Sequence, residues 1–196
     1  MKKTSALLVV DVQNDFCPGG ALSIPEGDKI IPVINKCIEF FENKKLRIFI
    51  TRDWHPKITT HFKKHGGVWP DHCIQNTEGA QFHPDLKIPK DAMILSKGTN
   101  PEEDAYSAFH AIDADGRKFL DILKHEGINE LYICGLATDY CVKESTLEAL
   151  KQGISVKVLI DGIKGVDLTP GDSERAVEEI VGRGAEKITF KDLLKE

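Results

Sequence analysis

The hydrophobic positions of this chain form short apolar runs that alternate with segments of helical periodicity. Most of the runs end directly before a charged residue or a glycine, which is typical of short buried β-strands. On this pattern we expect strands at residues 6–10, 46–51, 92–95, 131–134, 155–160 and 187–190.

Between these runs, apolar residues recur at the spacing of one helix face, as they do at positions 30, 31, 34, 38 and 41. We expect helices at residues 30–41, 119–124, about 140–152 and 172–181, the last capped by Asp172 or Ser173. Strands that alternate with helices predict a three-layer α/β/α fold with a mostly parallel central sheet. The chain shows no internal repeat and no linker, so we expect a single domain over residues 1–196.

Composition narrows the class of protein. A chain of 196 residues with 41% hydrophobic residues can bury a sizeable core. The net charge of −5 argues against nonspecific nucleic-acid binding, and no apolar run approaches the roughly 20 residues of a membrane helix. The five cysteines are an odd number without CxxC spacing, which indicates reduced thiols and a cytoplasmic protein. The sequence leaves the oligomeric state open, a homo-oligomer included.

Chemically capable residues follow four of the predicted strands. Asp11, Asp53, Lys97 and the turn before Cys141 each come after a separate strand. Ligands of parallel sheets bind beyond the carboxyl ends of the strands, so we expect these residues to form one site.

Cys141 is the candidate nucleophile. It lies where a strand has ended and a helix begins, and the helix dipole there favours the thiolate. Asp11 is the preferred proton acceptor, because a carboxylate at the end of a buried strand is partly desolvated and its pKa rises. A histidine distant in the sequence is an alternative base. Lys97 would hold the thiolate and stabilise the tetrahedral intermediate.

Histidines cluster in residues 52–89, a long segment rich in His, Gly and Pro that we expect to be a functional loop. Asp53 and His55 are two residues apart, so in an extended segment they face the same side. With His72 as a third ligand and His61 as a possible fourth, they would suit one divalent metal ion, zinc first and iron or manganese as alternatives.

Five ordered motifs, which together cover nearly the whole chain, resemble the nicotinamidase/pyrazinamidase branch of the isochorismatase-like cysteine hydrolases. They are residues 11–16 (DVQNDF), 51–56 (TRDWHP), 69–73 (WPDHC), 97–98 (KG) and 134–142 (CGLATDYCV). The resemblance implies that fold and a catalytic triad of Asp11, Lys97 and Cys141.

The same resemblance assigns further residues. It implies Asp53, His55 and His72 as metal ligands, and His61 at a position that is a ligand in only some members. It also implies a cis peptide bond between Leu136 and Ala137, and an oxyanion hole made by the amides of Ala137 and Cys141. The substrate-binding residues that it implies are Phe16, Trp69, Leu136 and Ala137, the first two as aromatic walls around the substrate ring.

The expected reaction is therefore hydrolysis of nicotinamide, and of pyrazinamide, through a Cys141 thioester, with nicotinate and ammonia as products and NAD salvage as the context. The small-molecule substrate would be the partner, with no nucleic acid and no membrane. One alternative is an N-carbamoyl or ureido amidohydrolase of the same superfamily, which needs the triad but no ion for a pyridine ring. The others are a zinc hydrolase with a metal-bound hydroxide and a redox or metal-binding regulator, neither of which uses all three triad residues.

Overall fold

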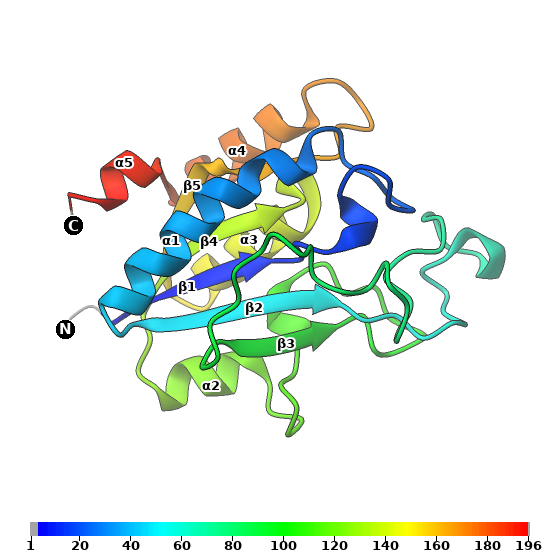
Figure 1. The fold of residues 1–196 in the computed structure, drawn as a ribbon, viewed down its shortest axis with the longest axis horizontal. Helices are drawn as coiled ribbons and strands as arrows, with labels where there is room; N and C mark the ends of the chain where they lie inside the picture. Colours follow the sequence, from blue (N-terminus) through cyan, green and yellow to red (C-terminus); the bar gives the residue numbers. More distant parts are fainter. Residues whose placement is uncertain (1–3, 196) are drawn as a thin grey trace.

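The computed structural model describes residues 4–195, which are built around one six-stranded sheet (Figure 1). Neighbouring strands are parallel throughout, in the order β3-β2-β1-β4-β5-β6, so the predicted fold class is confirmed. The strands are β1 (Ser5–Val10), β2 (Arg47–Asp53), β3 (Met93–Lys97), β4 (Glu130–Leu136), β5 (Ser155–Lys164) and β6 (Glu186–Ile188).

Helices cover both faces of the sheet, which gives the three predicted layers. The helices are α1 (Ile31–Asn43), α2 (Phe119–His125), α3 (Lys143–Lys151), α4 (Asp172–Gly182) and α5 (Phe190–Leu193). Alternate residues of β1 point to opposite faces: Leu7 and Val9 pack in the core beneath α1 and α5, and Leu8 packs in the core beneath α2, α3 and α4. Burying each such aliphatic side chain stabilises the fold by roughly 1.5–3 kcal/mol.

Several predicted element ends differ from the structure. Strands β2, β4 and β5 continue to Asp53, Leu136 and Lys164, beyond the predicted ends at residues 51, 134 and 160. The last strand stops at Ile188, because Thr189 begins α5 in a capping box with Asp192, and Phe190 is already helical. The cap of α4 is Gly171, with φ +89°, and the Ser173 amide in the first turn donates to Asp167 Oδ1 at 2.8 Å, so the prediction of Asp172 or Ser173 as the cap was wrong. A left-handed residue at that position favours glycine.

The strand order creates a switch point between β1 and β4. From β1 the chain proceeds outward to β2 and β3, then returns to place β4 on the other side of β1. Helices on opposite faces diverge there and leave a crevice beyond the carboxyl ends of the two strands. In Figure 1 the arrowheads of β1, β2 and β3 point toward the end of the sheet where the irregular segment after β2 gathers.

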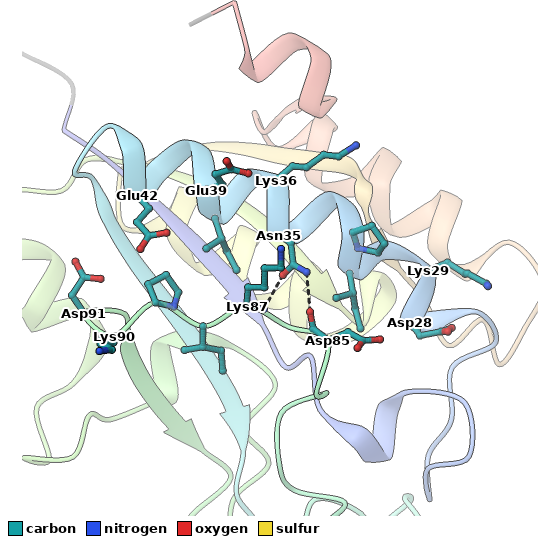
Figure 2. A pocket seen from close by; sticks show the side chains of 15 residues that line it. Asp28, Lys29, Asn35, Lys36, Glu39, Glu42, Asp85, Lys87, Lys90 and Asp91 are labelled. Atoms are coloured by element: carbon teal, nitrogen blue, oxygen red, sulfur yellow. Dashed lines mark hydrogen bonds between the residues drawn. The ribbon is translucent and has the colours of Figure 1, made fainter.

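That irregular segment, residues 54–92, contains one short 3-10 turn, η3 (Lys63–His65), as the sequence predicts for a functional loop. It is fastened to α1 by Asn35, whose side chain donates to the Asp85 carbonyl at 2.8 Å and accepts from the Lys87 amide at 2.9 Å (Figure 2). The shallow groove around these contacts has a volume of about 1190 Å³ and a mixed-charge rim, and none of the predicted site residues lines it. Across residues 4–195, every helix is too short or too polar to cross a lipid bilayer.

Candidate active site and metal site

Three of the predicted residues meet at the carboxyl ends of the central strands. Asp11 directly follows β1 with φ +50°, and Lys97 is the last residue of β3. Cys141 lies in a π-helical turn, η5 (Thr138–Val142), which connects β4 to α3. Asp11 and Lys97 are fully buried and Cys141 is 6% exposed, so the three side chains are shielded from bulk water.

Lys97 is the residue that joins this group together. Its Nζ lies 2.9 Å from Asp11 Oδ2 and 3.3 Å from Cys141 Sγ. The same ammonium also donates a hydrogen bond to Asp53 Oδ1. The sequence places Asp53 only among the metal ligands, whereas the structure shows that it shares Lys97 with the triad.

The charges around Lys97 keep it protonated. Burial alone would lower the pKa of Lys97, but the carboxylates of Asp11 and Asp53 raise it well above its ordinary value. Burial likewise works against ionisation of Asp53, yet Lys97 and the neighbouring histidines hold the pKa of Asp53 below its usual range. The site therefore contains a fixed ammonium next to the candidate nucleophile.

The resting protonation state of Cys141 differs from the sequence-based expectation. Burial raises the pKa of Cys141 well above its ordinary value; Lys97 opposes this shift and Asp11 adds to it. The helix end is therefore outweighed by burial in its effect on the pKa of Cys141, and a base that takes the thiol proton would assist ionisation. Burial also raises the pKa of Asp11, against the opposing charge of Lys97, which increases its capacity to take a proton. Carboxylate oxygens of Asp11 and Asp53 lie within 4.8 Å of Sγ.

Two buried polar side chains that the sequence analysis did not single out hold the carboxylates in place. The Thr51 hydroxyl donates to Asp11 Oδ1 at 2.7 Å. The Gln13 amide donates to the Asp53 carbonyl and accepts from the Asp53 amide, both at 2.8 Å, in the manner of a strand partner. Both are completely buried, and a polar residue in or beside a buried strand was the signal that could have found them.

The predicted metal ligands also come together. Imidazole nitrogens of His55, His61 and His72 lie within 4.8 Å of one another. Asp53 Oδ2 lies 3.7 Å from Nε2 of His55 and 4.0 Å from Nε2 of His72. All four side chains are buried.

The chemistry of this set fits a divalent ion. Both ring nitrogens of His55 are buried without a hydrogen-bond partner, an arrangement that is costly unless an ion or water binds them. Burial lowers the pKa of His72 to about 4 and also lowers the pKa of His61. Neutral imidazoles with one carboxylate are the ligands that zinc, iron and manganese bind.

Gly98 is required beside this cluster. Its φ is +66°, and a Cβ at this position would lie 2.4 Å from His55 Cε1. Gly98→Ala should displace the His55 ring and weaken zinc binding by roughly 10-fold or more, measured by competition with a fluorescent chelator. The control is Gly116→Ala, because Gly116 has φ +79° with nothing within 4 Å, so it incurs similar backbone strain without the contact. Equal zinc affinity in the two variants would refute this role of Gly98.

A small cavity of about 30 Å³ lies between the triad and the histidines. It is lined by Phe16, Leu22, Asp53, His61, Trp69, His72, Tyr106, Ala137, Tyr140, Cys141 and Val166.

The cavity includes three of the four predicted substrate-binding residues, Phe16, Trp69 and Ala137. Leu136 is buried in β4 and is not among the lining residues, although the peptide bond that follows it is cis, as the resemblance implies. Tyr106 also lines the cavity, although the sequence analysis did not name it, and its hydroxyl accepts a hydrogen bond from Trp69 Nε1 at 2.8 Å.

Comparisons with known proteins agree with this geometry. The model of the Isochorismatase domain matches residues 5–192. The chain is 42% identical to the nicotinamidase of Escherichia coli, over 95% of each chain. Its structure resembles the pyrazinamidase of Pyrococcus horikoshii in complex with zinc, with a TM-score of 0.88, 48% identity and coverage of 95% of this chain and 99% of that one. It also resembles yeast nicotinamidase bound to the inhibitor nicotinaldehyde, with a TM-score of 0.83, 28% identity and coverage of 94% and 99%.

Proposed function

This chain belongs to the isochorismatase-domain family, and we propose that its buried Asp11, Lys97 and Cys141 carry out amide hydrolysis. The chain is a hydrolase that converts nicotinamide to nicotinate and ammonia. The observation that carries the assignment of residues is the position of Lys97 Nζ, 2.9 Å from Asp11 and 3.3 Å from Cys141 beside a cluster of histidines.

The first half of the reaction forms a thioester. Asp11 takes the proton of the Cys141 thiol, and Sγ attacks the carboxamide carbon to give a tetrahedral oxyanion. Lys97 stabilises the thiolate as it forms, because its ammonium lies 3.3 Å from Sγ. Asp11 then gives the proton to the amide nitrogen, the C–N bond breaks, and ammonia leaves.

The second half returns the free enzyme. Asp11 takes a proton from water, the hydroxide attacks the thioester carbon, and the C–S bond breaks to release the acid. Asp11 returns the proton to Sγ. Backbone amides of Ala137, which precedes the η5 turn, and of Cys141, within it, would stabilise both oxyanions, and Phe16 and Trp69 would hold the ring.

We assign the metal site to Asp53, His55, His61 and His72, with zinc as the preferred ion. A bound ion there would act as a Lewis acid for the lone pair of the substrate's pyridine nitrogen and so orient the ring against Cys141. This role distinguishes nicotinamidase chemistry from an N-carbamoyl or ureido amidase, whose substrates have no ring nitrogen to bind. It also differs from a metal-hydroxide mechanism, because Cys141 remains the nucleophile. Pyrazinamide, a second ring carboxamide with such a nitrogen, should also be hydrolysed.

Two further features of the chain belong to this proposal. We infer a single domain, which the pairing of β1 and β6, near the two ends of the described residues, into the same sheet supports. A reducing compartment such as the cytoplasm suits an enzyme whose nucleophile is a free thiol, and all five cysteines are free.

The test of the proposed function is a paired measurement of kcat/KM for nicotinamide and benzamide. Benzamide has the same scissile amide and ring shape but lacks the pyridine nitrogen. A site built around a polar substrate atom rejects an analogue that lacks it, so we expect benzamide to be worse by roughly 10²-fold or more.

Chelation provides the companion measurement. Removing the metal should greatly reduce nicotinamide hydrolysis while Cys141 can still be alkylated, because Lys97, whose Nζ lies 3.3 Å from Cys141 Sγ, is held by the protein and not by the ion. Equal kcat/KM for the two amides, or full activity with no metal detectable, would show that the histidine cluster has another purpose.

A further inference from the structure

The three histidines of the candidate metal site differ in what holds their rings. Neither ring nitrogen of His55 has a hydrogen-bond partner. His72 Nδ1 donates to the carbonyl of Pro70 at 2.8 Å. His61 Nδ1 is hydrogen-bonded to the carboxylate of Asp104 through Oδ1, whereas the nearest carboxylate oxygen to His55 and His72, Asp53 Oδ2, lies 3.7 and 4.0 Å from their Nε2 atoms.

Asp104 belongs to a segment that crosses over the site after β3. This segment, residues 101–106, is fastened to the loop of His61 at its first residue, Pro101. The carbonyl of Pro101 accepts from the Thr60 amide at 2.8 Å, the Thr59 hydroxyl at 2.9 Å and the Thr60 hydroxyl at 3.1 Å. Its last residue, Tyr106, accepts from Trp69. Asp104 is therefore held between two anchored ends and not on a free loop.

The side chains of His61 and Asp104 differ in how deeply they are buried. The His61 side chain is 5% exposed, whereas that of Asp104 is 56% exposed. The imidazole ring of His61 also stacks on that of His55, with the ring centroids 4.5 Å apart and the ring planes at 17°. The carboxylate thus reaches from the surface to Nδ1 of a buried imidazole that offers a ring nitrogen within 4.8 Å of those of His55 and His72.

We propose that Asp104 is the positioning residue that makes His61 a ligand of the bound ion. This inference rests on the metal site of the proposed function and adds to it a residue that contacts neither ion nor substrate. A carboxylate on Nδ1 fixes the tautomer in which Nε2 carries the free lone pair, holds the ring plane, and increases the basicity of Nε2. Loss of the carboxylate leaves the ring free to rotate or to change tautomer.

The experiment measures the affinity of the purified full chain for Zn²⁺ by competition with a fluorescent chelator. Asp104→Ala should weaken Zn²⁺ binding by roughly 10- to 100-fold. Asp104→Asn should lose less Zn²⁺ affinity than Asp104→Ala, because an amide oxygen can still accept the hydrogen bond from His61 Nδ1–H, although it carries no charge. The matched control is Glu103→Ala, an exposed carboxylate on the same segment, which should bind Zn²⁺ as the unmodified chain does.

A second set of variants tests whether Asp104 acts through His61. In a His61→Ala background, Asp104→Ala should cause no further loss of affinity, because the group that it positions is gone. With Co²⁺ as the ion, the visible spectrum of Asp104→Ala should shift toward that of His61→Ala, which a general loosening of the segment would not produce.

Two results would overturn the inference alone: unchanged Zn²⁺ affinity in Asp104→Ala, or the same loss with and without His61. Failure of the unmodified chain to bind Zn²⁺ would overturn both the inference and the metal site on which it rests, so the two failures are distinguishable.

Discussion

Cys141→Ala should reduce kcat/KM for nicotinamide by at least about 10³-fold, because no other group at the site can form the thioester. The protein should stay folded and metal-loaded, since Cys141 is not one of the four assigned metal ligands and Lys97 still holds Asp53 through its hydrogen bond. The measurement is steady-state ammonia release together with the zinc content of the same preparation.

The control for this variant is Cys37→Ala, which removes a buried thiol from the core beneath α1. It should cost stability through the lost packing and leave kcat/KM close to that of the unmodified chain. If Cys141→Ala kept more than a few per cent of the activity, the covalent mechanism would be wrong and a metal-bound hydroxide would replace it.

Asp11→Asn should lower kcat/KM by roughly 10²- to 10⁴-fold, because the amide keeps the shape of the side chain but cannot take the proton of the thiol or of water. The rate at which iodoacetamide alkylates Cys141 should distinguish this loss of proton transfer from damage to the nucleophile itself. The charge of Asp11 raises the pKa of Cys141, so its removal leaves Asp53 as the remaining carboxylate that opposes Lys97, and alkylation of Cys141 should be at least as fast as before.

Asp91→Asn serves as the control for the charge change, because Asp91 is exposed at the groove beside α1 and should not affect turnover. Unchanged turnover in Asp11→Asn would remove Asp11 from the mechanism. Slower alkylation would show that Asp11 favours the thiolate, contrary to the charges at the site.

Most of the fold was predictable because the signals that specify it are local. Apolar runs predicted all six strands, and the alternation with helices predicted a parallel sheet with two covered faces. The errors fall at element ends, where one residue decides the outcome. Thr189 starts a helix where the pattern continued a strand, and Gly171 replaces the predicted side-chain cap of α4. Neither end is visible in the hydrophobic periodicity.

The family and its reaction were also predictable, and the comparisons confirm both. Motifs placed just after strands identify Asp11, Lys97 and Cys141, because parallel strands bring their carboxyl ends to one edge. The same motifs identify the histidine cluster, which the structure does bring together. The catalytic and ligand roles of these residues remain predictions for the experiments above.

The sequence by itself determined which residue types can do chemistry here and that they lie beyond the ends of the strands. Only the tertiary structure decided which of them touch. Lys97 reaches Asp53 across 44 residues, His61 reaches Asp104 across 43, and Trp69 reaches Tyr106 across 37. It also decided that the pKa of Cys141 is raised, since desolvation depends on what packs around a group. Hydrophobic periodicity indicates which face of each helix or strand is buried. Contacts between loops and the burial of charges depend on how segments distant in the sequence pack together, and the periodicity of each segment carries no information about that packing.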